Sequence, residues 1–358
     1  MSSSNIYVIA EAGVNHNGDP MLAKQLVRAA AAAGANAVKF QSFRTESLVT
    51  QEAELAEYQS IRETPGSTQF SMLRRLELSR EVERELQELA IGCGIEFLST
   101  PFDVPSLNFL VGDLKLSTIK IPSGEITNAP FLLEVARVAR RILLSTGGSS
   151  LREVQSAISV ISYGFHNSTG TPTPRQLRAQ PNRQARRVIK DRLSILHAVT
   201  AYPAPISDSN LLTIPLLAET FGCTVGLSDH TVGFEAALTA IGLGARIIEK
   251  HFTLDQTLPG PDHAASLNVE ELAAFVTSIR RASSALGDGT KRAQLSEISN
   301  LRSVRRSLVA TQPVEEGECF TNQNLGALRP ANGRSPFDYW QIVGSRARRS
   351  YRRNEPIE

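Results

Sequence analysis

The sequence predicts an α/β fold in which a closed (β/α)8 barrel, a TIM barrel, is followed by a small C-terminal domain. Short apolar runs alternate with helix-period segments from residue 6 to about residue 286. Eight such runs, most of them followed by a helical segment, are what a barrel of this kind requires. The length of 358 residues also exceeds that of one ordinary small domain. An open doubly wound sheet is the alternative, but no glycine-rich dinucleotide fingerprint follows the first strand.

The expected strands are short apolar runs at 6–10, 37–40, 96–99, 118–121, 142–144, 193–197, 225–227 and 246–249. The clearest expected helices are amphipathic segments at 20–33, 80–91, 130–139, 151–161 and 269–286.

Two segments interrupt this alternation. The segment 44–76 is long and polar, and we expect an active-site loop after the second strand. The segment 164–192 is long for a helix-to-strand connection and is rich in arginine. Because it lacks interleaved aromatic residues, we interpret it as a solvated insertion and not as a nucleic-acid-binding arm. Its place before the sixth strand puts it on the face opposite the catalytic loops.

The C-terminal part of the chain has a different pattern. A Gly-Asp-Gly-Thr run after Leu286 predicts a linker over 287–302, with the barrel domain over 1–286. Residues 303–358 alternate short strand-like pieces with turns, which predicts a compact mixed domain. A domain of fewer than about 60 residues needs support from the barrel or from a partner subunit.

Composition indicates a globular protein, with 41% hydrophobic and 21% charged residues. The formal charge of +2 neither favours nor excludes an acidic partner. Charged residues interrupt the longest apolar runs, and the N-terminal residues lack the basic and apolar regions of a signal peptide, so neither a membrane span nor secretion is expected. Cys93, Cys223 and Cys319 are scattered, as is typical of the reducing cytoplasm.

Two histidines follow neighbouring strand-like runs. His230 ends one run and His251 ends the next, with an amphipathic stretch at 234–243 between them. In a repeating strand–helix fold, both residues lie at strand ends on one face. Two imidazoles there can hold a divalent metal and leave positions open for substrate and water. Two histidines satisfied by hydrogen bonds are the alternative, which the pair alone does not exclude.

Residues at the ends of all the expected strands, nearly all of them polar, converge on the same mouth of the barrel. They are Glu11, Lys39, Gln41, Thr100, Phe102, Lys120, Ser123, Glu125, Ser145, Thr200, Tyr202, Ser228, Lys250 and Asp262. Lysines, hydroxyls and the glycine-rich turn at 145–148 suit a small dianion such as a phosphate. The alternative for Lys39 and Lys120 is an ion pair with Glu11 or Glu125 that only holds the mouth together. Buried ion pairs stabilise poorly, which favours the functional interpretation. Asp262 equally suits a helix cap.

The motifs in this pattern resemble those of the sialic acid synthase family, that is, the N-acetylneuraminate synthases and their legionaminate and pseudaminate relatives. The motifs are Ala10-Glu-Ala-Gly-Val-Asn-His-Asn-Gly18, Ala37-Val-Lys-Phe-Gln41, Phe97-Leu-Ser-Thr-Pro-Phe102, Lys120-Ile-Pro-Ser-Gly-Glu125, Leu144-Ser-Thr-Gly147, Gly226-Leu-Ser-Asp-His-Thr231, Glu249-Lys-His-Phe-Thr253 and Pro259-Gly-Pro-Asp-His263. The segment Leu328-Arg-Pro-Ala-Asn-Gly333 resembles the antifreeze-like (SAF) domain of these enzymes.

The resemblance implies condensation of phosphoenolpyruvate with an open-chain N-acyl hexosamine, giving a nine-carbon α-keto sugar acid and phosphate. The acceptor would be N-acetylmannosamine or 2,4-diacetamido-2,4,6-trideoxy-mannose. His230 and His251 match metal ligands for Mn²⁺ or Mg²⁺. The positions that match phosphoenolpyruvate contacts are Lys39, Lys120, Ser123, Ser145 and Ser228, and Thr200 stands where many relatives carry Ser or Asn.

The resemblance also assigns the acceptor side of the site. Tyr202 and Asp262 match sugar contacts, while Glu11 and Glu125 match carboxylates near the sugar and the attacking water. Arg329 matches an arginine that reaches the barrel of a partner subunit, which implies a domain-exchanged homodimer. Neither a nucleic acid nor a membrane is an expected partner.

Two other functions remain open. Another phosphoenolpyruvate-condensing barrel, using a phosphorylated pentose, would need further basic residues for a second phosphate, and none is clearly spare. A non-catalytic sugar-binding relative would be expected to have lost some of the lysines, carboxylates or histidines. The residues of the two histidine motifs resemble the neuraminate and legionaminate branch more than the pseudaminate branch.

Overall fold

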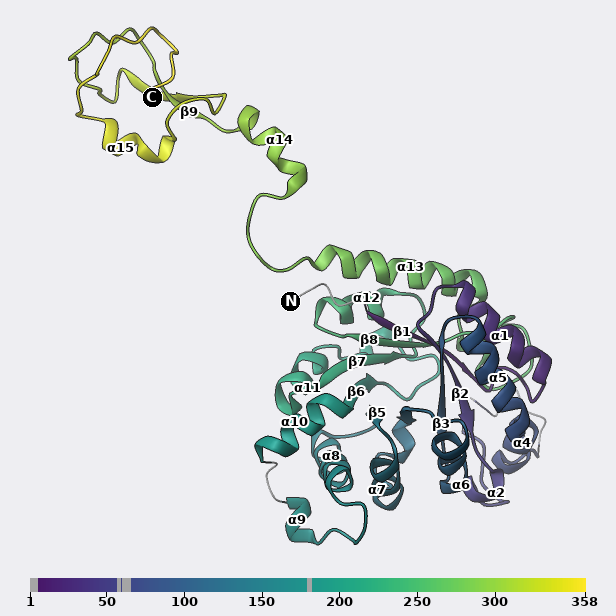
Figure 1. Cartoon of the computed structure of the whole chain (residues 1–358). Coiled ribbons are helices and arrows are strands. Elements are labelled where there is room, and N and C mark those ends of the chain that lie inside the picture. The colour runs from purple at the N-terminus through teal and green to yellow at the C-terminus, as the bar shows by residue number, and fades with distance from the viewer. Residues whose placement is uncertain (1–5, 57–58, 60–65, 179–181) are drawn as a thin grey trace. The chain divides into compact units, whose positions relative to one another are not determined.

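The computed structural model describes residues 6–56, 59, 66–178 and 182–358. The chain forms two compact units, Met1–Asp288 and Gly289–Glu358 (Figure 1). Parts of the predictions for the N-terminus, for the loop 44–76 and for the insertion 164–192 fall on 1–5, 57–58, 60–65 and 179–181, which lie outside the described residues.

The first unit is a barrel of eight parallel strands. They are β1 (Tyr7–Gly13), β2 (Ala37–Ser42), β3 (Glu96–Pro101), β4 (Thr118–Ile121), β5 (Arg141–Ser145), β6 (Leu193–Ala198), β7 (Thr224–Asp229) and β8 (Ile247–His251). All eight predicted strands are confirmed. β1 pairs with both β2 and β8, and β3 lies beside β4, so the sheet closes on itself. The open-sheet alternative is therefore wrong.

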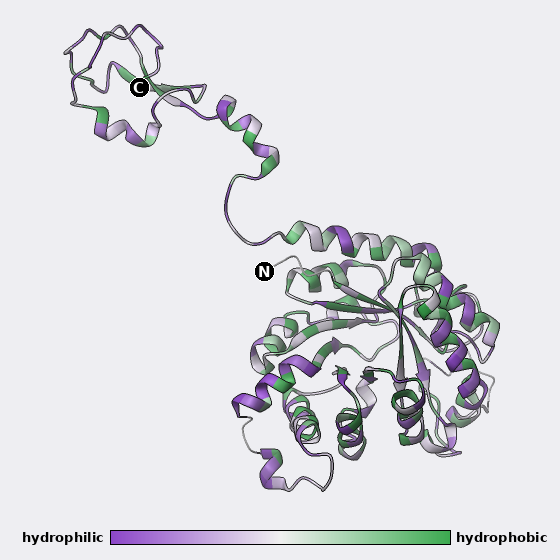
Figure 2. Ribbon diagram, viewed as in Figure 1, coloured by the Kyte–Doolittle hydropathy of each residue, from purple (hydrophilic) through white to green (hydrophobic). Residues whose placement is uncertain are grey.

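The helices surround this barrel (Figure 1). They are α1 (Pro20–Ala32), α2 (Thr45–Leu48), α4 (Gln69–Leu76), α5 (Arg80–Gly92), α6 (Val104–Asn108), α7 (Ala129–Val138), α8 (Leu151–His166), α9 (Pro174–Arg178), α10 (Arg183–Arg192), α11 (Thr213–Phe221), α12 (Glu235–Gly242) and α13 (Val269–Leu286). All five predicted helices are confirmed, with ends within a few residues of the predicted ones. They carry hydrophilic and hydrophobic residues side by side (Figure 2), as helices with one face on a core do.

The barrel interior is built in layers. Apolar side chains fill its centre, namely Tyr7, Ile9, Ala37, Leu98, Leu143, Leu196 and Ile247. Every second residue of a strand points to the same side. Two positions further along the same strands stand Glu11, Lys39, Thr100, Ser145, Ala198 and Glu249. The next inward layer, at the carboxyl ends of the strands, is therefore largely polar.

The insertion before β6 is only partly solvated. Most side chains of α9 and α10 are exposed, as predicted, but Ile189 is buried. The Arg192 guanidinium lies 3.9 Å from the centre of the Phe165 ring and donates a hydrogen bond to the Ala139 carbonyl at 2.6 Å. Arg137 donates to the Asn167 carbonyl at 3.3 Å. These contacts attach the insertion to α7 and α8 near the amino end of β5.

The second unit is a small mixed fold. Strands β9 (Ser307–Ala310) and β10 (Leu325–Leu328) pair antiparallel, and the unit also contains α14 (Leu295–Val304) and α15 (Tyr339–Ile342). Its core is Leu308, Ala310, Val314, Phe320, Leu325, Ile342, Ala347, Tyr351 and Ile357. The segment predicted as a linker contains most of α14, none of whose residues is buried. No helix in the described part of the chain is long and apolar enough to cross a membrane.

Candidate active site

A cavity of about 430 Å³ lies at the mouth of the barrel. Side chains from all eight strand ends line it, together with one face of α4. With the exception of Lys250, the candidate site residues predicted in the first unit are among its lining residues: Glu11, Lys39, Gln41, Thr100, Phe102, Lys120, Ser123, Glu125, Ser145, Thr200, Tyr202, Ser228, His230, His251 and Asp262. Arg329 lies in the second unit, directly after β10, where it is exposed.

Four buried charged side chains form the floor of this cavity. The Lys39 ammonium lies 2.7 Å from the Glu11 carboxylate and 3.7 Å from that of Glu249. The Lys120 ammonium lies 3.7 Å from the other oxygen of Glu249. Ser228 donates a hydrogen bond to Glu249 at 2.8 Å. Glu249 therefore stands between the two lysines and holds the cluster together.

The charge state of this cluster suits an anionic ligand. Burial raises the pKa of Glu249, but the charges of Lys120 and Lys39 outweigh burial and hold the pKa below its usual value. Burial lowers the pKa of Lys120 to about 8 in spite of Glu249. For Glu11, burial raises the pKa to about 7 against the charge of Lys39. The two lysines thus share the ionised carboxylate of Glu249, while Glu11 holds its proton more tightly than an ordinary glutamate does.

Hydroxyl groups surround the lysines. Lys39 donates to Thr100 Oγ1 at 3.1 Å, and the Gly147 backbone N–H donates to Ser123 Oγ at 2.9 Å. A Cβ atom at Gly147 would lie 2.7 Å from Thr200 Cγ2, so this turn requires glycine. Ser145 Oγ is buried without a hydrogen-bond partner. Burying an unpaired hydroxyl is costly, which points to a ligand as its partner.

The two predicted metal ligands lie side by side, with ring centres 5.6 Å apart. His230 Nδ1 donates to the Val199 carbonyl at 2.6 Å, so Nε2 of the neutral ring carries the lone pair, and it lies 3.4 Å from Ser228 Oγ. His251 Nδ1 is buried and has no hydrogen-bond partner. Burial lowers the pKa of both rings, and the neighbouring His230 lowers that of His251 further.

These two residues fit a divalent metal. Neutral imidazoles with a free nitrogen are good ligands, and a hydrogen bond from the other nitrogen to a carbonyl is the usual support for a metal-binding histidine. Within the described residues, no group of three or more His, Cys, Asp or Glu side chains is arranged to hold a metal ion. The protein would supply two ligands, leaving the other positions to substrate and water.

Tyr202 and Asp262 complete the wall beside the histidines. The Tyr202 ring centre lies 4.2 Å from that of His230. The Asp262 carboxylate lies 3.8 Å from His251 Nδ1, and burial raises its pKa to about 6. Asp262 precedes a short 3-10 helix, His263–Ala265, but its side chain makes no capping hydrogen bond. The alternative of a helix cap is therefore wrong for this side chain.

On strand β8 the prediction for Lys250 is wrong, and Glu249 is a site residue that was not predicted. Lys250, expected at the mouth, points out of the barrel, where its ammonium is buried 2.8 Å from Asp229. Side chains alternate along a strand, so Glu249 and His251 face inward while Lys250 does not. This period of two, counted back from His251, is the signal that could have identified Glu249.

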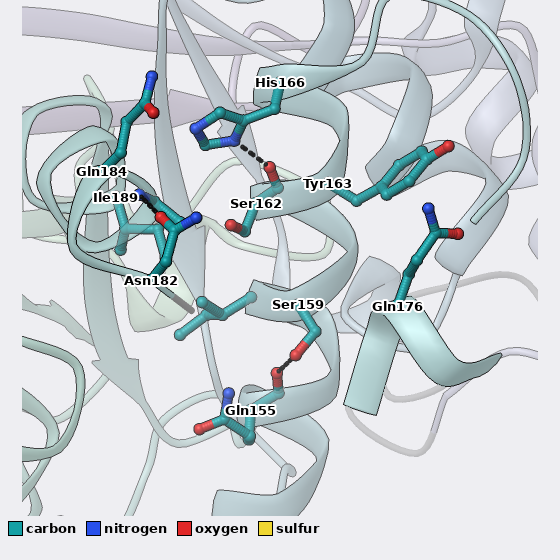
Figure 3. A pocket seen from close by; sticks show the side chains of 11 residues that line it. Gln155, Ser159, Ser162, Tyr163, His166, Gln176, Asn182, Gln184 and Ile189 are labelled. Atoms are coloured by element: carbon teal, nitrogen blue, oxygen red, sulfur yellow. Dashed lines mark hydrogen bonds between the residues drawn. The ribbon is translucent and has the colours of Figure 1, made fainter. Parts of the chain in front are cut away.

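A second cavity, of about 300 Å³, lies between α8 and the insertion (Figure 3). Its lining is neutral or weakly basic, with Gln155, Ser159, Ser162, Tyr163, His166 and Asn182 among the side chains drawn. His166 Nδ1 is already bonded to the Ser162 carbonyl at 2.8 Å. The paired lysines, carboxylates and histidines are all at the barrel mouth, which makes the mouth the candidate active site.

Comparison with known proteins shows which family this chain belongs to. The NeuB family matches over residues 26–291, and the SAF domain over residues 305–358. The N,N'-diacetyllegionaminic acid synthase of Campylobacter jejuni is 42% identical over 98% of this chain and 98% of its own length. The enzyme of the same name from Legionella pneumophila is 44% identical over 96% and 91%.

A solved structure extends the likeness to three dimensions. The N-acetylneuraminic acid synthetase of Leptospira borgpetersenii matches with a TM-score of 0.67 and 32% identity, covering 83% of this chain and 90% of that one. The family match covers the barrel from β2 to β8, and the relatives match along nearly the whole chain. The chain is therefore a synthase of the NeuB family with a C-terminal SAF domain.

Proposed function

We propose that this enzyme condenses phosphoenolpyruvate with an open-chain N-acyl hexosamine, in a reaction that depends on a divalent metal. The observation that carries the proposal is that two groups of residues with different chemical properties line one cavity. The cluster of Lys39, Lys120 and Glu249 lies beside two neutral histidines, His230 and His251, that line the same cavity. The first suits a small phosphorylated carboxylate, and the second suits a metal that binds an aldehyde oxygen.

Phosphoenolpyruvate would lie on the charged floor. Lys39 and Lys120 supply positive charge in a water-poor site, where charges act strongly on a bound anion. Ser123, Ser145 and Thr200 supply hydroxyls that fix the orientation of phosphate and carboxylate oxygens. The unpaired Ser145 Oγ supports this assignment.

His230 and His251 would hold Mn²⁺ or Mg²⁺. When bound, the metal supplies Lewis-acid chemistry, which makes the aldehyde carbon electrophilic and stabilises negative charge on its oxygen. Tyr202 and Asp262 stand next to the histidines and would orient the acceptor.

The reaction joins C3 of the enol to the aldehyde carbon. Glu11 can protonate the oxygen that was the aldehyde, because its pKa lies at about 7. Water then adds at C2, and its proton passes to Glu125, whose carboxylate accepts a hydrogen bond from Asn128 at 2.6 Å. The tetrahedral carbon expels phosphate as its C–O bond breaks, and the hydroxyl proton leaves with the phosphate.

We further propose a legionaminate-type acceptor, 2,4-diacetamido-2,4,6-trideoxy-mannose, in preference to N-acetylmannosamine. The names of the two relatives above, both N,N'-diacetyllegionaminic acid synthases, support this choice. A domain-exchanged homodimer, with Arg329 completing the site of the partner subunit, remains part of the proposal. The three cysteines are free, which supports a reducing, cytoplasmic location.

Phosphate release from phosphoenolpyruvate tests the reaction. Release is expected with Mn²⁺ and an N-acyl hexosamine, and it should stop when a chelator removes the metal. In ¹⁸O water, C–O cleavage places the label in the sugar acid and none in the phosphate. Release with a phosphorylated pentose but with neither amino sugar would overturn the proposal, as would release that is indifferent to the chelator.

A further inference from the structure

We propose that the inner face of α4 selects the acceptor by the absence of a hydroxyl at its far end. This inference rests on the proposed function and deepens it. Gln69, Met72, Leu73 and Leu76 all line the cavity. Their spacing of three and four residues places them on one face of the helix. Gln69 is the only polar residue among these four.

The wall formed by these four residues is held firmly. Met72 and Leu76 are buried in a cluster with Val14 and Phe43, against which Leu73 also packs. The helix begins with a capping box in which Thr68 and Ser71 bond to each other's backbone N–H.

Polar contacts join α4 to α2. Glu77, directly after α4, accepts a hydrogen bond from the Thr45 backbone N–H at 2.7 Å, and Arg74 pairs with Glu46 at 2.7 Å. The outward residues Ser71, Arg74 and Arg75 are exposed. The apolar inward face is therefore a fixed boundary of the site.

The chemistry sets which end of the acceptor meets this wall. The aldehyde carbon must lie at the charged floor, beside phosphoenolpyruvate and the histidines. The other end of the six-carbon chain then extends away from the lysines, toward the apolar side of the cavity. A hydroxyl placed against Met72 and Leu73 would lose its bonds to water without a partner, whereas a methyl group gains by burial.

Gln69 adds a second criterion. A side-chain amide offers both a donor and an acceptor, which complements an acylamino group. The face of α4 thus matches a hexosamine that lacks the 6-hydroxyl and carries a second acylamino group. It matches N-acetylmannosamine, which has hydroxyls at both positions, less well.

Two variants of this face test the inference separately, with kcat/KM measured for both sugars. Leu73→Gln should lower the preference for the 2,4-diacetamido-6-deoxy sugar over N-acetylmannosamine by about tenfold, the usual scale of discrimination in an apolar pocket. Gln69→Leu should lower kcat/KM for the diacetamido sugar by a larger factor than kcat/KM for N-acetylmannosamine. The KM for phosphoenolpyruvate should stay the same in both variants. Arg75→Gln, on the outer face of the same helix, is the matched control.

Each outcome decides between the proposals. An equal loss for both sugars in Leu73→Gln, at unchanged thermal stability, means that α4 only supports the fold and overturns this inference alone. A wild-type enzyme that prefers N-acetylmannosamine overturns it as well. No turnover of any N-acyl hexosamine by the wild-type enzyme overturns the proposed function and this inference together.

Discussion

Glu83 provides a quantitative test of the barrel's electrostatics. It lies on α5 behind β2 and β3 and is only 4% exposed. Its carboxylate accepts a hydrogen bond from Ser42 Oγ, which lies 2.6 Å from Ser99 Oγ. Burial raises the pKa of Glu83 to about 7, because the hydrogen bond from Ser42 and the charge of Arg44 oppose it only in part.

The sign and the size of the effect follow by linkage. The folded protein binds this proton more tightly than the unfolded chain, whose glutamate has an ordinary pKa of 4.5. The destabilisation is therefore absent below pH 4.5, grows as the pH rises, and is complete above about pH 7. At about 1.4 kcal/mol per pKa unit, it amounts to about 3 kcal/mol.

Glu83→Gln removes the charge and keeps an oxygen that can accept from Ser42. We expect the variant to match the wild type near pH 4 and to exceed its free energy of unfolding by about 3 kcal/mol at pH 8. Urea unfolding should be followed by circular dichroism, because the single tryptophan, Trp340, lies in the second unit. Glu88→Gln, exposed on the same helix, is the control. If the free energies of unfolding of Glu83→Gln and the wild type differ by the same amount at pH 4 and pH 8, the reasoning is refuted.

Four further predictions concern the site. Glu249→Gln leaves two buried lysines with one carboxylate partner and should lower kcat/KM for phosphoenolpyruvate at least about 100-fold, since breaking a buried pair costs about 3–5 kcal/mol. Unchanged phosphate release would show that the lysines do not need Glu249 in order to bind phosphoenolpyruvate. His230→Gln should abolish tight Mn²⁺ binding in calorimetry while His166→Gln does not, and equal affinity in both would contradict the metal assignment. Glu125→Gln should lower kcat about 100-fold with little change in KM, and normal turnover would exclude it as the base. Arg329→Ala and Lys39→Ala should each be nearly inactive alone but regain activity when mixed, and failure of mixing would speak against domain exchange.

Much of the site was predictable because side-chain direction along a strand is a local property. Each strand run ends in polar residues, and parallel strands in a barrel bring their carboxyl ends to one mouth. The prediction therefore placed Lys39, Lys120, His230 and His251 around one cavity without any knowledge of distances. It failed at Lys250 because residues were taken from the strand end without regard to the period of two.

Other features depend on contacts between segments far apart in the chain. Glu249 meets Lys39 and Lys120 only because closure of the barrel brings β8, β2 and β4 around one interior. The wall on α4 was not predicted either, since the segment 44–76 reads as a polar loop until its helix packs on Val14 and Phe43.

The sequence by itself determined the order of strands and helices, the two-unit organisation and the polar identity of the barrel mouth, because these follow from periodicity and from residue type. Only the tertiary structure decided which charges share a carboxylate, which nitrogen of His230 carries the lone pair, and which face of α4 lines the cavity. Those depend on distances across the barrel, which no local pattern encodes.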